Sequence, residues 1–356
     1  MRYLTRNQLL TVSGAAVASV GSGFLHGRGA VLPFAISAVA LATLASVVGL
    51  ATEQLGERFG PGATGVLQSA IGNLPELFVG IFALRAGLVA VVQAAVIGSI
   101  LANSLLVLGL AILVGGLKHG TQRFSSEQPK VIATLLLLAI AALTLPTLVH
   151  ELHTPAEAHA DALSIACAVV LLIVFILSVP YSLKSELPKE MENANPGVRP
   201  PHASWPLPMT IGVLVAAGVG AAFVSDWFVD ALEPAMAMLH LSQAFTGLVV
   251  VAIAGNAVEN VVGIQLAARN KPDYAVSVIL NSSLQVALAL IPVLVILSFL
   301  FSPHHLTLIM PPLLVVALGF AAALGAVIVY DGESVWLEGV ALIGLYGIIA
   351  ASFWWG

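Results

Sequence analysis

Long runs of apolar residues, separated by short polar stretches, follow one another along almost the whole chain. A helix needs roughly 20 apolar residues to cross the hydrocarbon core of a membrane. We therefore expect a transmembrane helix in each run of about that length, at residues 8–25, 31–52, 63–84, 87–115, 131–150, 161–183, 208–229, 242–267, 273–301, 306–330 and 334–354. The pattern predicts an all-α integral membrane protein with about eleven transmembrane helices.

The composition supports this fold class and excludes several functions. The chain has 356 residues, of which 59% are hydrophobic and only 9% are charged, whereas soluble domains carry about 25% charged residues. Cys167 is the single cysteine, so no disulfide forms within the chain. The sequence has no basic patch for a nucleic acid. It also has no catalytic Ser/His, two-His or paired-Asp motif at membrane depth, so we expect neither an enzyme nor a cofactor.

The basic residues indicate the orientation in the membrane. If the N-terminus is cytoplasmic, the predicted outer loops contain only Arg28 and Arg85. The other eleven of the 13 lysines and arginines then lie on the cytoplasmic side. Cytoplasmic loops carry an excess of lysine and arginine. We therefore expect a cytoplasmic N-terminus and a C-terminus on the opposite side.

A polar motif occurs twice inside these apolar runs. The first copy reads Gly-Asn-Leu-Pro-Glu at residues 72–76, and the second reads Gly-Asn-Ala-Val-Glu at residues 255–259. Glycine, asparagine and glutamate recur with one offset, since 255 − 72 and 259 − 76 are both 183. Glutamates at membrane depth are costly, and they are functional by default. Glu76 and Glu259 are therefore the leading candidate site residues.

The two motifs lie five predicted spans apart, which indicates an inverted repeat. An odd number of spans makes two repeats face opposite ways, as in transporters whose site lies at the midplane between repeats. The predicted organisation is one leading helix plus two inverted five-helix repeats. Its parts are residues 1–30 for the leading helix, 31–183 for the first repeat, 184–206 for a cytoplasmic linker and 207–356 for the second repeat.

The candidate residues offer oxygen ligands. Carboxylate, amide and carbonyl oxygens are the groups that Ca²⁺ binds. The predicted metal-site residues are Gly72, Asn73, Glu76, Ser99, Asn103, Gly255, Asn256, Glu259, Ser282 and Gln285. Small polar residues also join transmembrane helices, and this is the alternative role for Ser99, Asn103, Ser282 and Gln285. Two facing carboxylates in a medium of low dielectric need protons or a divalent cation as partners, so the two ions compete.

Other ionisable groups have simpler explanations. Histidines and acidic residues gather at residues 150–161, where they suit either a transition-metal site or, as we favour, a solvated loop. Together with Asp230 and Glu233 they make the predicted outer side anionic, which draws cations in. Glu53 and Glu233 end predicted spans on opposite faces. They are either entry-path carboxylates or ordinary interfacial charges.

Several motifs resemble the calcium/proton branch of the calcium/cation antiporter superfamily. They are residues 51–60 (ATEQLGERFG), 72–77 (GNLPEL), 98–103 (GSILAN), 225–226 (SD), 233–235 (EPA), 255–259 (GNAVE) and 282–285 (SSLQ). The resemblance implies that Ca²⁺ binds between Glu76 and Glu259, with protons as counter-substrate, while the second and seventh spans slide. The sequence departs from the family pattern at Asn260, at Asn281 and at Gln68-Ser69.

We therefore expect a secondary transporter that exchanges Ca²⁺ for protons in a lipid bilayer by alternating access. One alternative is Na⁺/H⁺, K⁺/H⁺ or Na⁺/Ca²⁺ exchange on the same scaffold. Spans four and nine contain no carboxylate apart from Asp273, the first residue of span nine, which favours protons over sodium as the counter-ion. An ion channel is a more remote alternative. The sequence identifies no oligomeric partner.

Overall fold

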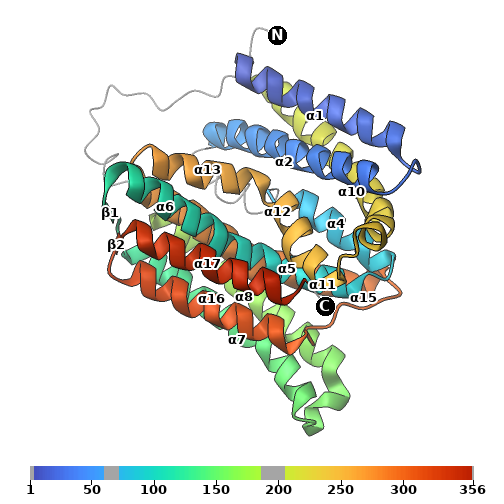
Figure 1. Cartoon of the computed structure of the whole chain (residues 1–356), viewed down its shortest axis with the longest axis vertical. Helices are drawn as coiled ribbons and strands as arrows, with labels where there is room; N and C mark the ends of the chain where they lie inside the picture. Colours follow the sequence, from blue (N-terminus) through green and yellow to red (C-terminus); the bar gives the residue numbers. More distant parts are fainter. Residues whose placement is uncertain (1–3, 60–71, 186–204, 355–356) are drawn as a thin grey trace. The chain divides into compact units, whose positions relative to one another are not determined.

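The computed structural model describes residues 4–59, 72–185 and 205–354, and these residues are almost entirely helical (Figure 1). They form two compact units. The first unit comprises Met1–Phe82 and Phe175–Leu239, and the second comprises Ala83–Val174 and His240–Gly356. Each unit therefore contains segments from both halves of the sequence.

Three long helices build the first unit: α1 (Arg6–Leu25), α2 (Val31–Phe59) and α10 (Leu207–Leu239). Each of them packs against the other two. The Phe34 ring of α2 stacks on Phe228 of α10 with centroids 5.0 Å apart. The buried hydroxyls of Ser22 and Ser37, 2.6 Å apart, join α1 to α2. The first unit also contains most of α4 (Leu74–Arg85) and the end of α8 (Ala160–Ser185).

The second unit contains the remaining elements. From the first half of the sequence these are α5 (Val89–Leu101), η1 (Ala102–Val107), α6 (Leu108–His119), β1 (Gln122–Arg123), α7 (Glu127–Glu151), η2 (Pro155–His159) and the start of α8. From the second half they are α11 (Gln243–Phe245), η3 (Thr246–Val251), α12 (Ala252–Gly255), α13 (Ala257–Ala268), α14 (Pro272–Gln285), η4 (Val286–Leu290), α15 (Ile291–Phe301), α16 (Pro312–Tyr330), β2 (Glu333–Ser334) and α17 (Trp336–Ser352). Helix α17 packs on α6, and α16 packs on α7 (Figure 1).

Three of these segments, η1, η3 and η4, are π-helical. Segment η1 lies inside the continuous helix α5–η1–α6, and η4 lies inside α14–η4–α15. A π-helical turn is rare and often occurs at a functional site. Each of these two turns falls beside candidate residues, since Asn103 lies in η1 and Gln285 directly precedes η4.

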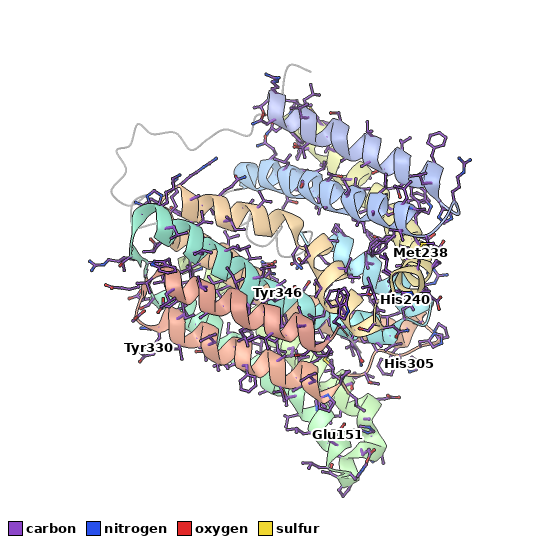
Figure 2. All side chains as sticks on the ribbon, viewed as in Figure 1. Glu151, Met238, His240, His305, Tyr330 and Tyr346 are labelled. Carbon is purple, nitrogen blue, oxygen red and sulfur yellow. The ribbon has the colours of Figure 1, made fainter. Side chains whose placement is uncertain are left out.

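A two-stranded sheet, which the sequence pattern did not predict, joins two loops of the second unit. Strand β1 pairs antiparallel with β2, with Gln122 opposite Ser334 and Arg123 opposite Glu333. The Arg123 and Glu333 side chains form an exposed ion pair at 3.1 Å. Nearby, the Lys130 ammonium lies 4.6 Å from the ring centroid of Tyr330, which Figure 2 labels at the end of α16.

The helical membrane fold is confirmed. Within the described residues, eight helices are long and apolar enough to cross a membrane, and Gln243–Gly255 and Trp336–Ser352 are shorter apolar helices. The predicted span 63–84 and the predicted linker 184–206 lie partly outside the described residues. The predicted helical start at residue 306 is wrong, because residues 302–311 are neither helix nor strand and α16 begins at Pro312. Pro303 and Pro311 limit helix formation there.

Candidate cation site

Both polar motifs lie at the start of a helix. In the first, Gly72 and Asn73 form a turn and α4 begins at Leu74, where the Asn73 carbonyl accepts a hydrogen bond from the Leu77 N–H at 3.0 Å. In the second, Asn256 (φ −90°, ψ 17°) ends α12 and directly precedes α13. An asparagine therefore stands immediately before a new helix in each motif.

Pro75 suits this placement. It is the second residue of α4, where its missing N–H would have had no partner within the helix. Glu76 and Glu259 are each the third residue of their helix. The partial positive charge at a helix N-terminus stabilises a carboxylate there. Glu76 is half-buried, and the Glu259 side chain lies outside the described residues.

Four of the predicted neutral ligands form one hydrogen-bonded network inside the second unit. The Asn103 amide nitrogen donates to the side-chain oxygen of Asn256 at 3.1 Å and to the Ser282 hydroxyl at 2.9 Å. The Asn256 amide nitrogen donates to the Ser99 hydroxyl and to the Ala252 carbonyl. All four network side chains are buried. The structure thus brings Ser99, Asn103, Asn256 and Ser282 together.

The network contains one oxygen that is suited to a further ligand. The side-chain oxygen of Asn103 is buried, and it has no hydrogen-bond partner in the part of the chain that the structure describes. A buried polar atom of this kind is costly unless it finds a partner. A hard cation binds a neutral amide oxygen of this type. Asn103 can therefore hold Asn256 and Ser282 with its nitrogen while it offers its oxygen to a cation.

A second polar pair lies beside this network. The hydroxyls of Ser104 and Ser283 are 3.0 Å apart and buried. The repeat offset could not have found this pair, because 283 − 104 is 179 rather than 183. Gln285, by contrast, is half-buried at the last residue of α14, and Gly255 is half-buried at the end of α12.

Glycines allow close contact between α5 and η3. Helix α5 contains Ser99, and η3 leads through α12 to Asn256. A Cβ atom on Gly98 would overlap the backbone of Leu248. A Cβ atom on Gly247 would overlap the carbonyl oxygen of Val91 and lie 2.8 Å from the Ala94 Cβ. Small residues permit this kind of backbone approach between membrane helices. The short distance across the two segments lets the Asn256 amide reach Ser99.

The histidine-rich segment at residues 150–161 has a different arrangement. The two oxygens of the Glu157 carboxylate accept from His150 Nδ1 at 2.9 Å and from His153 Nδ1 at 3.2 Å. Among the described residues, no group of three or more His, Cys, Asp or Glu side chains is arranged to hold a metal ion.

Comparison with known proteins assigns the family. The model of the family described as "Sodium/calcium exchanger protein" matches residues 29–184 and 209–355. A Ca²⁺/H⁺ antiporter of Synechocystis sp. is 35% identical over 342 residues, which are 92% of this chain and 92% of that protein. The Ca²⁺/H⁺ antiporter ChaA of Bacillus subtilis is 34% identical over 349 residues, with 97% of both chains covered.

Solved structures agree with this assignment. The structure of native YfkE superposes with a TM-score of 0.79 at 32% identity, over 97% of this chain and 98% of that one. The H⁺/Ca²⁺ exchanger CAX is only 16% identical and shares the fold, with a TM-score of 0.75 over 98% of this chain and 92% of that one. By the extent of these matches, the chain belongs to the sodium/calcium exchanger protein family.

Proposed function

We propose that this protein exchanges Ca²⁺ for protons across a membrane by alternating access. The carboxylates of Glu76 and Glu259 would bind either Ca²⁺ or protons. Relatives that cover more than nine-tenths of the chain are named Ca²⁺/H⁺ antiporters, and these names describe transporters rather than enzymes. The observation that carries the proposal is the repeated placement of a glutamate three residues after an asparagine that directly precedes a helix.

The chemistry of this placement suits competition between the two ions. A helix N-terminus stabilises a carboxylate but supplies only a fraction of a positive charge. Two carboxylates that serve one site therefore need a dication or protons to neutralise them. Since each proton removes a ligand from Ca²⁺, an acidic compartment releases Ca²⁺ and a neutral one loads it. The two glutamates would titrate as one coupled pair.

Neutral oxygens would complete the coordination of Ca²⁺, which takes six to eight oxygen ligands. The Asn103 side-chain oxygen is buried in the second unit, and the described residues contain no hydrogen-bond donor for it. The hydroxyls of Ser99 and Ser282 accept hydrogen bonds from the network amides, and each oxygen keeps a further lone pair. We propose Asn103, Ser99 and Ser282 as ligands, with Asn256 as the residue that orients them.

The proposal also includes the organisation and orientation derived from the sequence. The N-terminus would be cytoplasmic and the C-terminus would lie on the opposite side, with a leading helix and two inverted five-helix repeats. Thiol-reactive labels of single-cysteine variants test this, starting from Cys167→Ser. A cysteine replacing Ser125 would react from the cytoplasmic side, and one replacing His159 from the outside.

The test of function uses purified protein in liposomes that carry a pH-sensitive dye inside. With an acidic interior and Ca²⁺ outside, the wild type should accumulate Ca²⁺ while the interior becomes more alkaline. Glu76→Gln and Glu259→Gln should each abolish both signals, while Glu151→Gln, a change at an exposed carboxylate of α7 (Figure 2), should leave them intact. Robust uptake by either glutamine variant of the motif glutamates would refute the proposed site.

The same liposomes separate the alternative functions. Uptake that needs a sodium or potassium gradient instead of a proton gradient would assign exchange with that ion. Calcium flux that needs no counter-ion gradient, at rates measurable as electrical current, would assign a channel. Either result would replace the Ca²⁺/H⁺ proposal.

A further inference from the structure

The segment 302–311, which joins α15 to α16, has no regular secondary structure, yet much of it is buried. Leu306 and Leu308 are 0% exposed and Met310 is 2% exposed, whereas Thr307 and Ile309 between them are half-buried. Figure 2 labels His305 in the exposed part of this segment. A buried backbone outside helices and sheets must find hydrogen bonds elsewhere.

Side chains from several helices supply these hydrogen bonds. Three N–H groups of the segment donate to hydroxyls: Leu306 to Ser298 of α15 at 2.8 Å, Leu308 to Ser164 of α8 at 3.0 Å, and Met310 to Thr147 of α7 at 2.9 Å. The Thr147 hydroxyl in turn donates to the Leu308 carbonyl at 3.2 Å. The segment is therefore fixed to α7, α8 and α15.

Gln93 connects α5 to the same segment. Its amide nitrogen donates to the Ile309 carbonyl at 2.8 Å and to the Thr307 carbonyl at 3.2 Å, so both of its N–H groups are used. Gln93 is 8% exposed, and loss of these bonds would leave the carbonyls of the half-buried Thr307 and Ile309 without this donor. The two carbonyls hold the amide between them, so these bonds oppose displacement of this part of α5 relative to the segment.

Gln93 lies six residues before Ser99 on α5, a separation of about 9 Å along the helix axis. The close contacts of Gly98 and Gly247 already fix the distance between α5 and η3. A slide of α5 along its axis or a turn about it would change the distance from Ser99 to Asn256, and the bonds from Gln93 oppose both motions.

We propose that Gln93 is a positioning residue for cation exchange. It holds α5 against the segment 302–311 and thereby keeps Ser99 aligned with Asn256. This inference rests on the proposed function, since it assigns Ser99 and Asn256 to the Ca²⁺ site. Gln93 itself does not bind the cation.

The test measures the KM for Ca²⁺, the maximal rate and thermal stability of variants in the liposome assay. Gln93→Met keeps the side-chain length and removes both donors. We expect the loss of both bonds to weaken Ca²⁺ binding by about the net contribution of a single hydrogen bond, which corresponds to a roughly fivefold higher KM for Ca²⁺. The maximal rate should stay near that of the wild type. A matched control is Ser22→Ala, which removes a buried hydrogen bond of the first unit and should lower stability without changing KM.

Gln93→Glu gives a pH-dependent version of the same change. A protonated glutamate donates one hydrogen bond, and an ionised one donates none and faces two carbonyl oxygens. The ratio of its KM to that of the wild type should therefore be small at acidic pH and grow as the pH rises. A role limited to folding would lower thermal stability and leave this ratio constant.

The outcomes separate this inference from the proposed function. If the wild type exchanges Ca²⁺ for protons while folded Gln93→Met has the wild-type KM, the inference is wrong and the proposed function stands. If Gln93→Met does not fold, Gln93→Glu provides the test instead. A ratio of its KM to the wild-type KM that stays constant across pH would then overturn the inference. If the wild type itself moves no Ca²⁺ in a proton gradient, the proposed function fails, and the inference fails with it.

Discussion

The side-chain nitrogen of Asn103 lies 3.1 Å from the side-chain oxygen of Asn256 and 2.9 Å from the Ser282 hydroxyl. Asn103 belongs to η1, Asn256 separates α12 from α13, and Ser282 belongs to α14. One amide group therefore joins three segments that come from both halves of the sequence. Because its two N–H groups are both used, the amide is fixed in orientation, and its oxygen is left without a hydrogen-bond partner among the described residues.

The Asn103→Ala variant tests whether this amide organises the site. It removes the donor to Asn256 and to Ser282, together with the oxygen proposed as a Ca²⁺ ligand. We expect the KM for Ca²⁺ to rise about tenfold or more, and the free energy of unfolding to fall by about 1–3 kcal/mol. Calcium uptake into liposomes and thermal unfolding in detergent measure the two effects.

Asn7→Ala, a change at an exposed position in the first turn of α1, is the control for loss of an asparagine side chain. It should leave both the KM and the unfolding temperature near their wild-type values. An Asn103→Ala protein that is destabilised but keeps the wild-type KM would show that the network only joins helices, which is the alternative that the sequence left open.

The buried Ser104 and Ser283 hydroxyls, 3.0 Å apart, predict a non-additive pair of mutations. Either single change to alanine leaves the other hydroxyl without this partner, and we expect it to cost about 1–2 kcal/mol of stability. The double variant removes both polar groups, so it should be less destabilised than the sum of the two single variants. Thermal unfolding of all four proteins measures the coupling, and strict additivity would mean that the two hydroxyls do not interact.

One physical reason allowed the sequence to indicate both the fold class and the two candidate glutamates. Polar and charged groups are expensive inside an apolar run, so Glu76 and Glu259 stand out without any structural knowledge. Their equal spacing from Asn73 and Asn256 indicated a repeat. In the structure both asparagines directly precede a helix, a placement that the sequence pattern did not indicate. The family match then gave independent support for this class of protein.

Other features could not be predicted because they depend on three-dimensional contacts. Residues 306–310 (LTLIM) are mostly apolar and lead directly into an apolar run, so hydropathy alone assigned them to a helix. Only the partners of the backbone explain the path of this segment. In the sequence, Gln93 is an isolated polar residue near the start of a span. Its hydrogen-bond partners could not be identified there, because they lie more than 200 residues away along the chain. The π-helical turns have no sequence signature, and the Ser104–Ser283 pair does not follow the repeat offset.

The contact between α5 and η3 makes Gly98 intolerant of any side chain. Gly98→Ala would place a methyl group against the Leu248 backbone, which cannot rotate away as a side chain could. We expect less folded protein and, in the fraction that folds, weaker Ca²⁺ uptake, because α5 would be displaced from Asn256. Expression yield, gel-filtration profile and liposome uptake measure this.

Gly344→Ala on α17 is the matched glycine control. A Cβ there meets no other atom within 4 Å, and alanine is favoured over glycine in a helix by about 0.5–1 kcal/mol. This variant should therefore fold at least as well as the wild type. Equal behaviour of Gly98→Ala and Gly344→Ala would contradict the close approach of α5 to η3.

Trp205, two residues before the start of α10, predicts a stability effect in the first unit. Its side chain is 0% exposed, its backbone N–H donates to the side-chain oxygen of Gln54 at 3.1 Å, and its indole N–H donates to that of Gln8 at 3.4 Å. Gln8 lies on α1 and Gln54 on α2, so Trp205 links the beginning of α10 to both helices. Trp205→Ala should lower the free energy of unfolding by about 3–5 kcal/mol, as expected for removal of a fully buried aromatic side chain.

Two further variants serve as controls for this prediction. Trp205→Phe should lower the free energy of unfolding less, because it keeps most of the packing and the backbone hydrogen bond. Trp336→Ala, at a residue of α17 that is 47% exposed, should lower it least. Thermal unfolding in detergent ranks the three variants, and a Trp205→Ala protein as stable as Trp336→Ala would contradict this role of Trp205 in the first unit.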